Sequence, residues 1–214
     1  VAQDDAGAAP WLDVTVAVAT LMADERTRVY GIDAASGRLS TLLALPATGD
    51  VVPADDVDRT ARLLGMLRDL IDAREAGAPP SSPVLLLVDG FGAFRDAYEH
   101  HATDGGVLAS LIEIVRAGRH AGVHVVIASE RAMSLPGAIA AGIGESFVLR
   151  MPAEADYGMV GASLDMLRAA PPGRAMHLPS GCEMQFAVPI AAPVSEPGTE
   201  NENDAVTDAG LDID

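Results

Sequence analysis

The stretch that most constrains the fold is Ser82–Phe94, which reads S-P-V-L-L-L-V-D-G-F-G-A-F. Five apolar residues in a row, Val84–Val88, end in a single acid, Asp89. A short unbroken apolar run between turn-forming residues is typical of a strand that is buried on both faces. Open α/β sheets bind their ligands at the carboxyl ends of such strands. We therefore expect Asp89 at the functional edge of a sheet; the alternative is a buried strand that merely ends in Asp.

Patterns on both sides of this run alternate between helix and strand. Apolar residues recur every three or four positions in Asp55–Glu75 and Gly106–Ala121, which predicts amphipathic helices. Thr27–Asp33 and Val123–Ser129 are short segments that predict further strands. Strands separated by helices favour a parallel sheet with right-handed crossovers. The fold class that we predict is therefore α/β, with a central, mainly parallel sheet flanked by helices.

The order of these strands sets the geometry of the expected site. We expect the strand that ends at Asp89 to lie between the strands that end at Asp33 and Ser129. Parallel strands in one sheet end at the same edge, so all three residues should lie along that edge.

The rest of the chain gives weaker signals. Trp11–Ala23 is predicted to be a helix, although its valines also permit a strand. Ala34–Gly49 is expected to be a loop, Pro136–Ile143 a short helix and Ser146–Met151 a strand. Ala153–Leu167 is expected to be a weak helix, and Ala175–Leu178 to pair with Glu183–Val188 in a closing hairpin.

The chain is strongly acidic, which bears on its partners. Its 214 residues carry 31 acidic side chains against 14 Arg and no Lys, for a net charge of −17. Residues 190–214 hold seven of the acids and no Arg, and we predict this segment to be a disordered acidic tail. The predicted domain over residues 1–189 keeps 24 acids against 14 Arg, so it remains acidic without the tail. Nucleic-acid binding requires clustered positive charge, which disfavours that class of partner.

Cysteine content and hydropathy bear on the compartment. Cys182 is the only cysteine, so no disulfide framework exists and a reducing compartment is expected. No apolar run approaches the roughly 18 residues that are needed to cross a bilayer. The sequence after Val1 lacks the pattern of a signal peptide.

Several stretches, in their order and spacing, carry a family resemblance. The three longest read R-V-Y-G-I-D at Arg28–Asp33, V-L-L-L-V-D-G-F-G-A-F-R at Val84–Arg95 and A-G-R-H-A-G-V-H-V-V-I-A-S-E-R at Ala117–Arg131. Together with L-L-A-L-P at Leu42–Pro46 and P-P-G-R-A at Pro171–Ala175, they resemble the FtsK/SpoIIIE-type P-loop ATPase domains. Within that family the chain looks most like the C-terminal, degenerate ATPase domain of type VII (ESX) secretion motors.

That resemblance implies a RecA-like P-loop NTPase core that binds ATP and Mg²⁺. Asp89 then takes the position of the Walker B aspartate, which helps to hold the Mg²⁺. Ser129 falls where the family places a sensor residue at a strand end. The alternative is that its hydroxyl only caps the turn.

The phosphate-binding motif departs from the family pattern. A P-loop reads G-x-x-x-x-G-K-[ST], in which the Lys reaches the phosphates and the hydroxyl holds Mg²⁺. In the matching frame Gly7 remains, but Ala8 and Ala9 take the positions of the Lys and of the hydroxyl residue. Because the chain contains no Lys, no shift of register restores the motif. Weak or vestigial nucleotide binding is expected; alternatively, Val1–Pro10 is only a linker.

A second departure follows the Walker B position. Many active motors of this type carry a Glu there to orient the attacking water, whereas this chain has Gly90. The resemblance therefore implies that no residue of this chain is catalytic. Type VII motors are similar in this respect, since their downstream domains often carry D-G followed by an aromatic residue, which is Phe91 here.

The role that the resemblance implies is docking and regulation. Such a domain would bind secretion substrates or neighbouring ATPase domains of the same motor and regulate an active ATPase elsewhere. The implied substrates are small helical-hairpin secreted proteins, and a hexameric ring is one arrangement of the motor. The implied location is the cytoplasmic side of the cell membrane, which the domain reaches only through its parent protein. The alternative is a weakly active, ATP-binding translocase module for protein or DNA.

Other polar residues have a functional and a plain interpretation. Arg119 and Arg131 are candidates for an arginine finger that faces a neighbouring subunit, but such residues more often pair with a local carboxylate. His120 and His124 have the spacing of helical zinc ligands. Gly122 and the start of a strand intervene between them, however, and no third ligand is near in the sequence.

Two further possibilities concern nucleophiles and docking. Ser163, Ser180 and Cys182 have no base that the sequence places beside them, so nucleophilic catalysis is not predicted. The methionine-rich stretch Ala153–Leu167 is a candidate docking surface, because methionine faces adapt to varied partners. The alternative, that these side chains belong to the core, is the favoured one.

Overall fold

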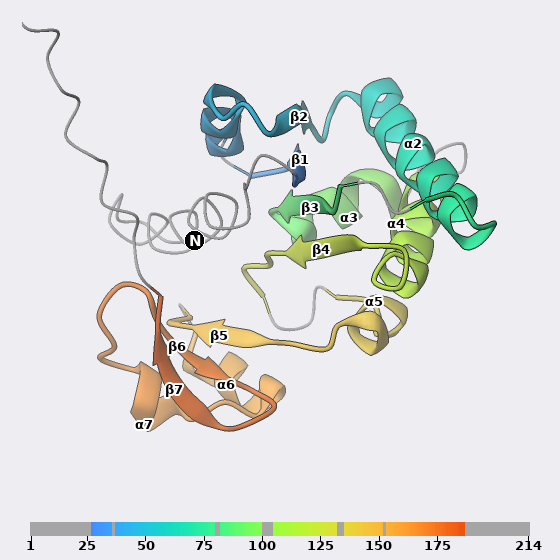
Figure 1. The fold of residues 1–214 in the computed structure, drawn as a ribbon. Coiled ribbons are helices and arrows are strands. Elements are labelled where there is room, and N and C mark those ends of the chain that lie inside the picture. Colours follow the sequence, from blue (N-terminus) through green and yellow to red (C-terminus); the bar gives the residue numbers. More distant parts are fainter. Residues whose placement is uncertain are drawn as a thin grey trace, which may run out of the picture.

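A computed structural model of the chain describes residues 27–35, 37–79, 82–99, 105–131, 135–151 and 153–186. These residues form a central four-stranded sheet with helices and a second, smaller sheet (Figure 1). Three predictions lie outside the described residues: the helix at Trp11–Ala23, the degenerate P-loop positions, and the acidic tail over residues 190–214.

The central sheet is parallel throughout. Its strands are β1 (Arg28–Asp33), β2 (Thr48–Pro53), β3 (Val84–Asp89) and β4 (Val123–Ile127), in the order β2-β1-β3-β4. β3 is therefore an inner strand, and all six of its residues are buried. The predicted α/β class and the position of the Asp89 strand between its two neighbours are both confirmed.

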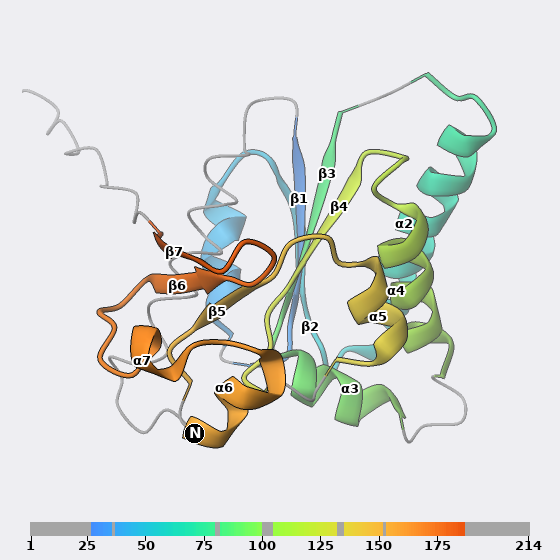
Figure 2. The same cartoon turned by 90° about the horizontal axis from the view of Figure 1, so that it is seen from below.

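Helices flank the central sheet (Figure 2). On one side lie α2 (Val57–Glu75), α4 (Gly105–Ala117) and α5 (Gly137–Gly142). The short 3₁₀ helix η1 (Arg38–Ala44) lies on the other side, and the small sheet lies beyond β4, at the opposite end of the central sheet from β2 (Figure 1). α2 begins at an N-cap aspartate, Asp56, whose side chain accepts the Arg59 N–H. Its buried stripe comprises Thr60, Leu63, Leu64, Leu67 and Ile71.

The small sheet is antiparallel. It consists of β5 (Phe147–Leu149), β6 (Arg174–His177) and β7 (Cys182–Gln185), in that order. Two short helices, α6 (Glu154–Val160) and α7 (Leu164–Leu167), pack with it around a hydrophobic cluster separate from that of the central sheet.

Two predictions near the N-terminal half need correction. The segment Ala34–Gly49, expected to be a loop, contains η1 and the start of β2, a strand that the sequence patterns do not predict. A helix, α3 (Phe91–Glu99), was not predicted, because Gly90 and Gly92 resemble a turn in the sequence. Its apolar stripe of Phe91, Phe94 and Tyr98 has helical spacing and is fully buried.

Two more corrections concern the C-terminal half. The strand expected at Ser146–Met151 is shorter and pairs antiparallel with β6, so it does not extend the parallel sheet. The helix expected at Ala153–Leu167 is broken at Gly161, whose φ of 73° ends α6 in the left-handed region that favours glycine. No helix in the described ranges is both long and apolar enough to span a membrane.

The buried centre of β3 gives a test of the packing. Leu86 has no exposed surface, so Leu86→Ala should lower the free energy of unfolding by about 2–5 kcal/mol. Leu43→Ala is the matched control, because Leu43 is 54% exposed and its truncation should cost well under about 1 kcal/mol. Urea denaturation followed by circular dichroism measures both changes. Equal losses in the two variants would contradict this assignment of the core.

Candidate functional site at the carboxyl edge of the central sheet

Asp33 ends β1 and organises the loop that follows. Its carboxylate accepts the backbone N–H groups of Ala35 (3.1 Å), Gly37 (3.1 Å) and Leu39 (2.9 Å). A carboxylate with three backbone donors is strongly held, since hydrogen bonds to a charged group exceed neutral ones in strength. Asp33 therefore fixes the turn between β1 and η1, which leaves its oxygens committed to the backbone.

Asp89 lies beside Asp33, since the two are register partners on β1 and β3. The residue is only 4% exposed, and its Oδ1 has no hydrogen-bond partner among the described residues. Burial is the main reason that the pKa of Asp89 rises to about 6, and the negative charges of Asp33 and Glu130 add to the effect. The Gly90 N–H and the charge of Arg38 act in the opposite direction on this pKa.

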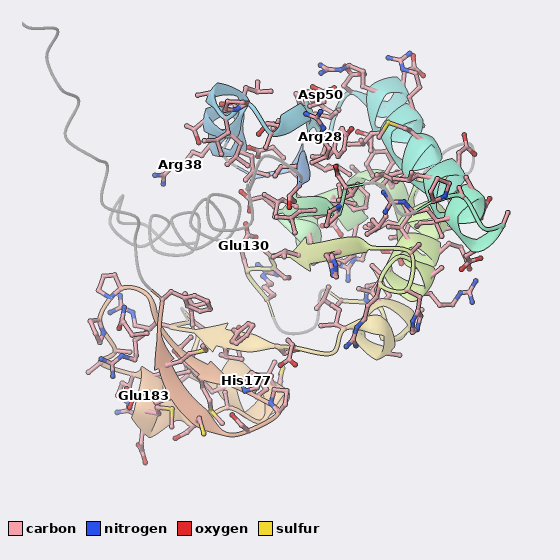
Figure 3. The ribbon with its side chains drawn as sticks, viewed as in Figure 1. Arg28, Arg38, Asp50, Glu130, His177 and Glu183 are labelled. Carbon is pink, nitrogen blue, oxygen red and sulfur yellow. The ribbon has the colours of Figure 1, made fainter. Side chains whose placement is uncertain are left out.

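The side chains around this edge are unevenly charged. Figure 3 labels Glu130, which follows β4, and Arg38, which begins η1. Asp33, Asp89 and Glu130 are acidic, and Arg38 is the cation that stabilises the charged form of Asp89. Negative charge thus predominates where an α/β sheet usually receives its ligand.

Gly90 connects β3 to α3 in a conformation that favours glycine. Its φ is 70°, and a Cβ added there would lie 2.8 Å from the Ala35 Cβ and 3.0 Å from the Ala34 carbonyl carbon. The Ala34 N–H donates to the Asp89 carbonyl oxygen at 3.0 Å, so the loop after β1 is tied to the end of β3. Any side chain at position 90 meets this loop.

Ser129 follows β4, at the same edge. Its hydroxyl donates to the carbonyl oxygen of Arg131 at 3.0 Å, which is the turn-capping contact of the plain interpretation. Arg119 and Arg131 are both exposed. His120 lies in the turn after α4 and His124 is exposed on β4.

One oxygen at this edge is a candidate ligand for Mg²⁺. The unpartnered Oδ1 of Asp89 is the type of oxygen that Mg²⁺ binds. Asp33 is already satisfied by three N–H groups. Within the described ranges no group of three or more His, Cys, Asp or Glu is arranged to hold a metal ion. A nearby cavity of about 410 Å³ includes Asp33 in its lining but not Asp89.

A second polar cluster, which the sequence does not reveal, lies on the small sheet. The His177 ring contacts the Ser180 hydroxyl through Nδ1 (2.7 Å) and the Glu145 carboxylate through Nε2 (2.5 Å). It also stacks on Phe147, with the ring centroids 5.1 Å apart. The Ser180 hydroxyl accepts the Cys182 N–H at 3.3 Å as well. A base does lie beside Ser180, but these contacts fasten the β6–β7 turn to the residues before β5.

The methionine-rich stretch contributes mainly to the core. Met151, Val160, Leu164 and Met166 pack against the buried cluster of the small sheet, and Leu167 is fully buried there. Met159, by contrast, is 62% exposed. The core interpretation therefore holds for most of the stretch.

The family follows from comparison with known proteins. Residues 15–178 match the FtsK/SpoIIIE family, so the chain belongs to that family. The ESX-3 secretion system protein EccC3 of Mycobacterium tuberculosis (strain H37Rv) is 28% identical over 180 residues. That alignment covers 75% of this chain but 14% of EccC3, so the chain corresponds to a small part of its relative.

Solved structures show the same fold. Thermomonospora curvata EccC (ATPases 2 and 3), in complex with a signal sequence peptide, has a TM-score of 0.66 and 21% identity, covering 87% of this chain and 36% of that chain. EssC (ATPases 2 and 3) from Geobacillus thermodenitrificans has a TM-score of 0.68 and 14% identity, and the match covers 85% of this chain and 37% of that chain. The fold is therefore that of the P-loop NTPase domains in these proteins, and the chain is similar to ATPase-domain regions of type VII secretion proteins.

The raised pKa of Asp89 predicts how stability depends on pH. An acid whose pKa is higher in the folded state stabilises the fold at low pH, and this contribution is lost as pH rises through about 6. Asp89→Asn carries no charge, so above about pH 7 it should be more stable than the parent by about 1–3 kcal/mol. The difference should shrink below about pH 4. Thermal unfolding across this range measures it.

Asp33→Asn is the matched control for that measurement. Its amide oxygen replaces a carboxylate that accepts three backbone N–H groups, so the variant should lose about 1–3 kcal/mol at neutral pH. The two isosteric changes are thus expected to act in opposite directions. A stability difference for Asp89→Asn that stays constant between about pH 4 and 8 would show that Asp89 is not the titrating group.

Proposed function

We propose that this domain is a non-hydrolytic, ATPase-like domain of a type VII secretion motor. In this role it docks secretion substrates or neighbouring ATPase domains of the same motor and regulates an active ATPase elsewhere. Binding of ATP and Mg²⁺ is weak or vestigial. The domain acts at the cytoplasmic side of the membrane, to which its parent protein anchors it.

The geometry of Gly90 is the observation that carries this proposal. The position after the Walker B aspartate is where a catalytic Glu would orient water, and here a side chain would collide with Ala34 and Ala35. The Ala35 N–H donates to the Asp33 carboxylate, and the Ala34 N–H donates to the Asp89 carbonyl oxygen, so both residues are held in place. Replacing Gly90 by Glu alone would therefore strain the edge without building a working site.

The sequence at the expected P-loop position supports the same conclusion. Gly7, Ala8 and Ala9 occupy the P-loop frame, and the chain has no Lys to reach a phosphate. Losing such a charge-assisted contact costs about 1.5–3 kcal/mol of binding free energy. The acidic groups near Asp89 would further repel a triphosphate.

Two exposed apolar side chains support a docking role. Phe147 and Met159, on the small sheet and on α6, are 41% and 62% exposed. Apolar side chains of this kind suit a short amphipathic helix from a secreted helical-hairpin protein. Thermomonospora curvata EccC, whose fold is similar, has been solved in complex with a signal sequence peptide. The net charge of −17 disfavours nucleic acid as the partner.

A weakly active translocase module is the second candidate function. The buried Oδ1 of Asp89 favours it, because a carboxylate oxygen without a partner among the described residues is suited to bind Mg²⁺. The two functions differ in whether the chain hydrolyses ATP.

Nucleotide assays separate these two functions. We expect MgATP binding to be weak by isothermal titration calorimetry and phosphate release to be negligible. Gly90→Glu should remain inactive and should also lower the thermal midpoint, because its Cβ meets the loop after β1. Micromolar binding of MgATP together with ATP turnover at about 1 s⁻¹, the low end for working enzymes, would refute the non-hydrolytic proposal.

Docking is tested with fluorescently labelled C-terminal peptides of candidate secreted proteins. Small interfaces bind weakly, so we expect saturable anisotropy changes with dissociation constants on the order of micromolar. Met159→Ser should weaken binding, whereas Leu43→Ser, which changes a 54% exposed residue on η1, should not. If no candidate saturates below about 100 µM while the domain is folded, the docking role fails.

A further inference from the structure

A second cavity, of about 350 Å³, lies beside β2 and the first half of α2. Its walls come from β1, β2 and α2, and they comprise Tyr30, Asp50, Arg59, Arg62, Leu63 and Met66. Arg59, Arg62 and Met66 are three and four positions apart, which brings them to one face of the helix. Two guanidinium groups and an apolar surface therefore border the same cavity on an otherwise acidic protein.

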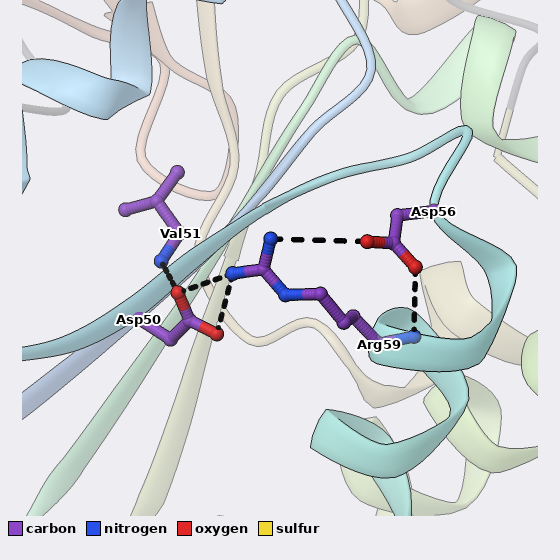
Figure 4. Close-up of polar contacts among 4 residues, drawn as sticks. All are labelled: Asp50, Val51, Asp56 and Arg59. Carbon is purple, nitrogen blue, oxygen red and sulfur yellow. Dashed lines mark hydrogen bonds and ion pairs between the residues drawn. The ribbon is translucent and has the colours of Figure 1, made fainter.

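The carboxylate of Asp50, which lines the cavity, is already bound by Arg59 (Figure 4). Asp50 accepts from the Arg59 Nη2 at 2.8 and 2.9 Å and from the Val51 N–H at 2.9 Å. A backbone N–H that is bonded in this way is not available for pairing with a further strand. Asp56 lies 3.8 Å from the other side of the Arg59 guanidinium. Arg59 is thus neutralised from within the chain.

Arg62 differs from Arg59 in its partners. Across the described ranges Arg62 forms no hydrogen bond or ion pair, and it is exposed. Met66, one turn further along α2, is 42% exposed. Tyr30 closes the other wall and packs directly on Gly49, where an added Cβ would lie 2.4 Å from the tyrosine ring. A carboxylate next to an aliphatic side chain is the chemistry that this cavity fits.

We propose that the acidic segment over residues 190–214 of this same chain docks at the cavity. One of its carboxylates pairs with Arg62, and a neighbouring aliphatic side chain contacts Met66. The segment carries seven acids and no Arg or Lys, and it places aliphatic residues next to acids at Leu211 and Ile213. The opposite charges of segment and cavity are the first argument for this occupant.

The tether is the second argument. At about 3.3 Å per extended residue, the segment spans up to roughly 80 Å, which exceeds the dimensions of a domain of this size. Exposed ion pairs are individually weak. A segment in the same chain, however, is present at a high effective concentration, so weak contacts suffice for substantial occupancy. The site would then be filled in cis until an acidic partner competes for it.

Paramagnetic relaxation enhancement in the whole 214-residue chain tests the proposal. Cys182, which is exposed, is changed to Ser, and a nitroxide is attached through Ala209→Cys. We expect selective broadening of the backbone amide signals of residues 59–66. Adding Arg62→Gln, or raising the salt to about 0.5 M, should reduce this broadening to the level of the remaining surface.

The control variant is Arg68→Gln. Arg68 lies on the same helix but donates to Ser110 and does not line the cavity, so its change should leave the broadening intact. Replacing the four aspartates of residues 204–214 by Asn should abolish it, as Arg62→Gln does. Absence of selective broadening at residues 59–66, or broadening that survives Arg62→Gln, would overturn the proposal. Neither result depends on the docking role proposed above.

Discussion

The contact between Gly90 and the loop after β1 is the constraint on which the carboxyl edge depends. Asp33 holds that loop with three backbone hydrogen bonds, and the loop in turn occupies the space beside Gly90. α3 begins directly after Gly90, with Phe91 buried in the core. The absence of a side chain at position 90 is thus linked to how β1, β3 and α3 fit together. A side chain at position 90 would therefore require the surrounding backbone to move.

Local patterns in the sequence predict three strands of the central sheet, β1, β3 and β4, but not its edge strand β2. The continuous apolar run of β3 requires burial on both faces, and parallel neighbours follow from the helices between the strands. Local patterns also explain the errors. α3 follows Gly90, and glycine is a turn signal in a sequence. η1 depends on backbone N–H groups that donate to the Asp33 carboxylate, which no periodicity reveals. The separate pairing of β5 is decided by contacts with β6, which is distant in the sequence.

The candidate site is less predictable than the fold. Asp89 is placed correctly from the sequence, since a residue type at a strand end is a local property. The unpartnered oxygen of Asp89 and its raised pKa arise from burial and from neighbouring charges, which only the folded chain defines. The same holds for His177 and Glu145, which lie far apart in the sequence but meet at 2.5 Å. Long-range polar contacts of this kind have no sequence signal in a single chain.

Charge links these separate features. At the carboxyl edge Asp33, Asp89 and Glu130 gather negative charge. On the α2 side Arg62 presents positive charge beside an apolar wall. Under the proposed roles, an anionic group is repelled from the edge where the family fold would bind nucleotide and is attracted to the side of the sheet. None of these charged side chains belongs to the hydrophobic clusters that pack around β3.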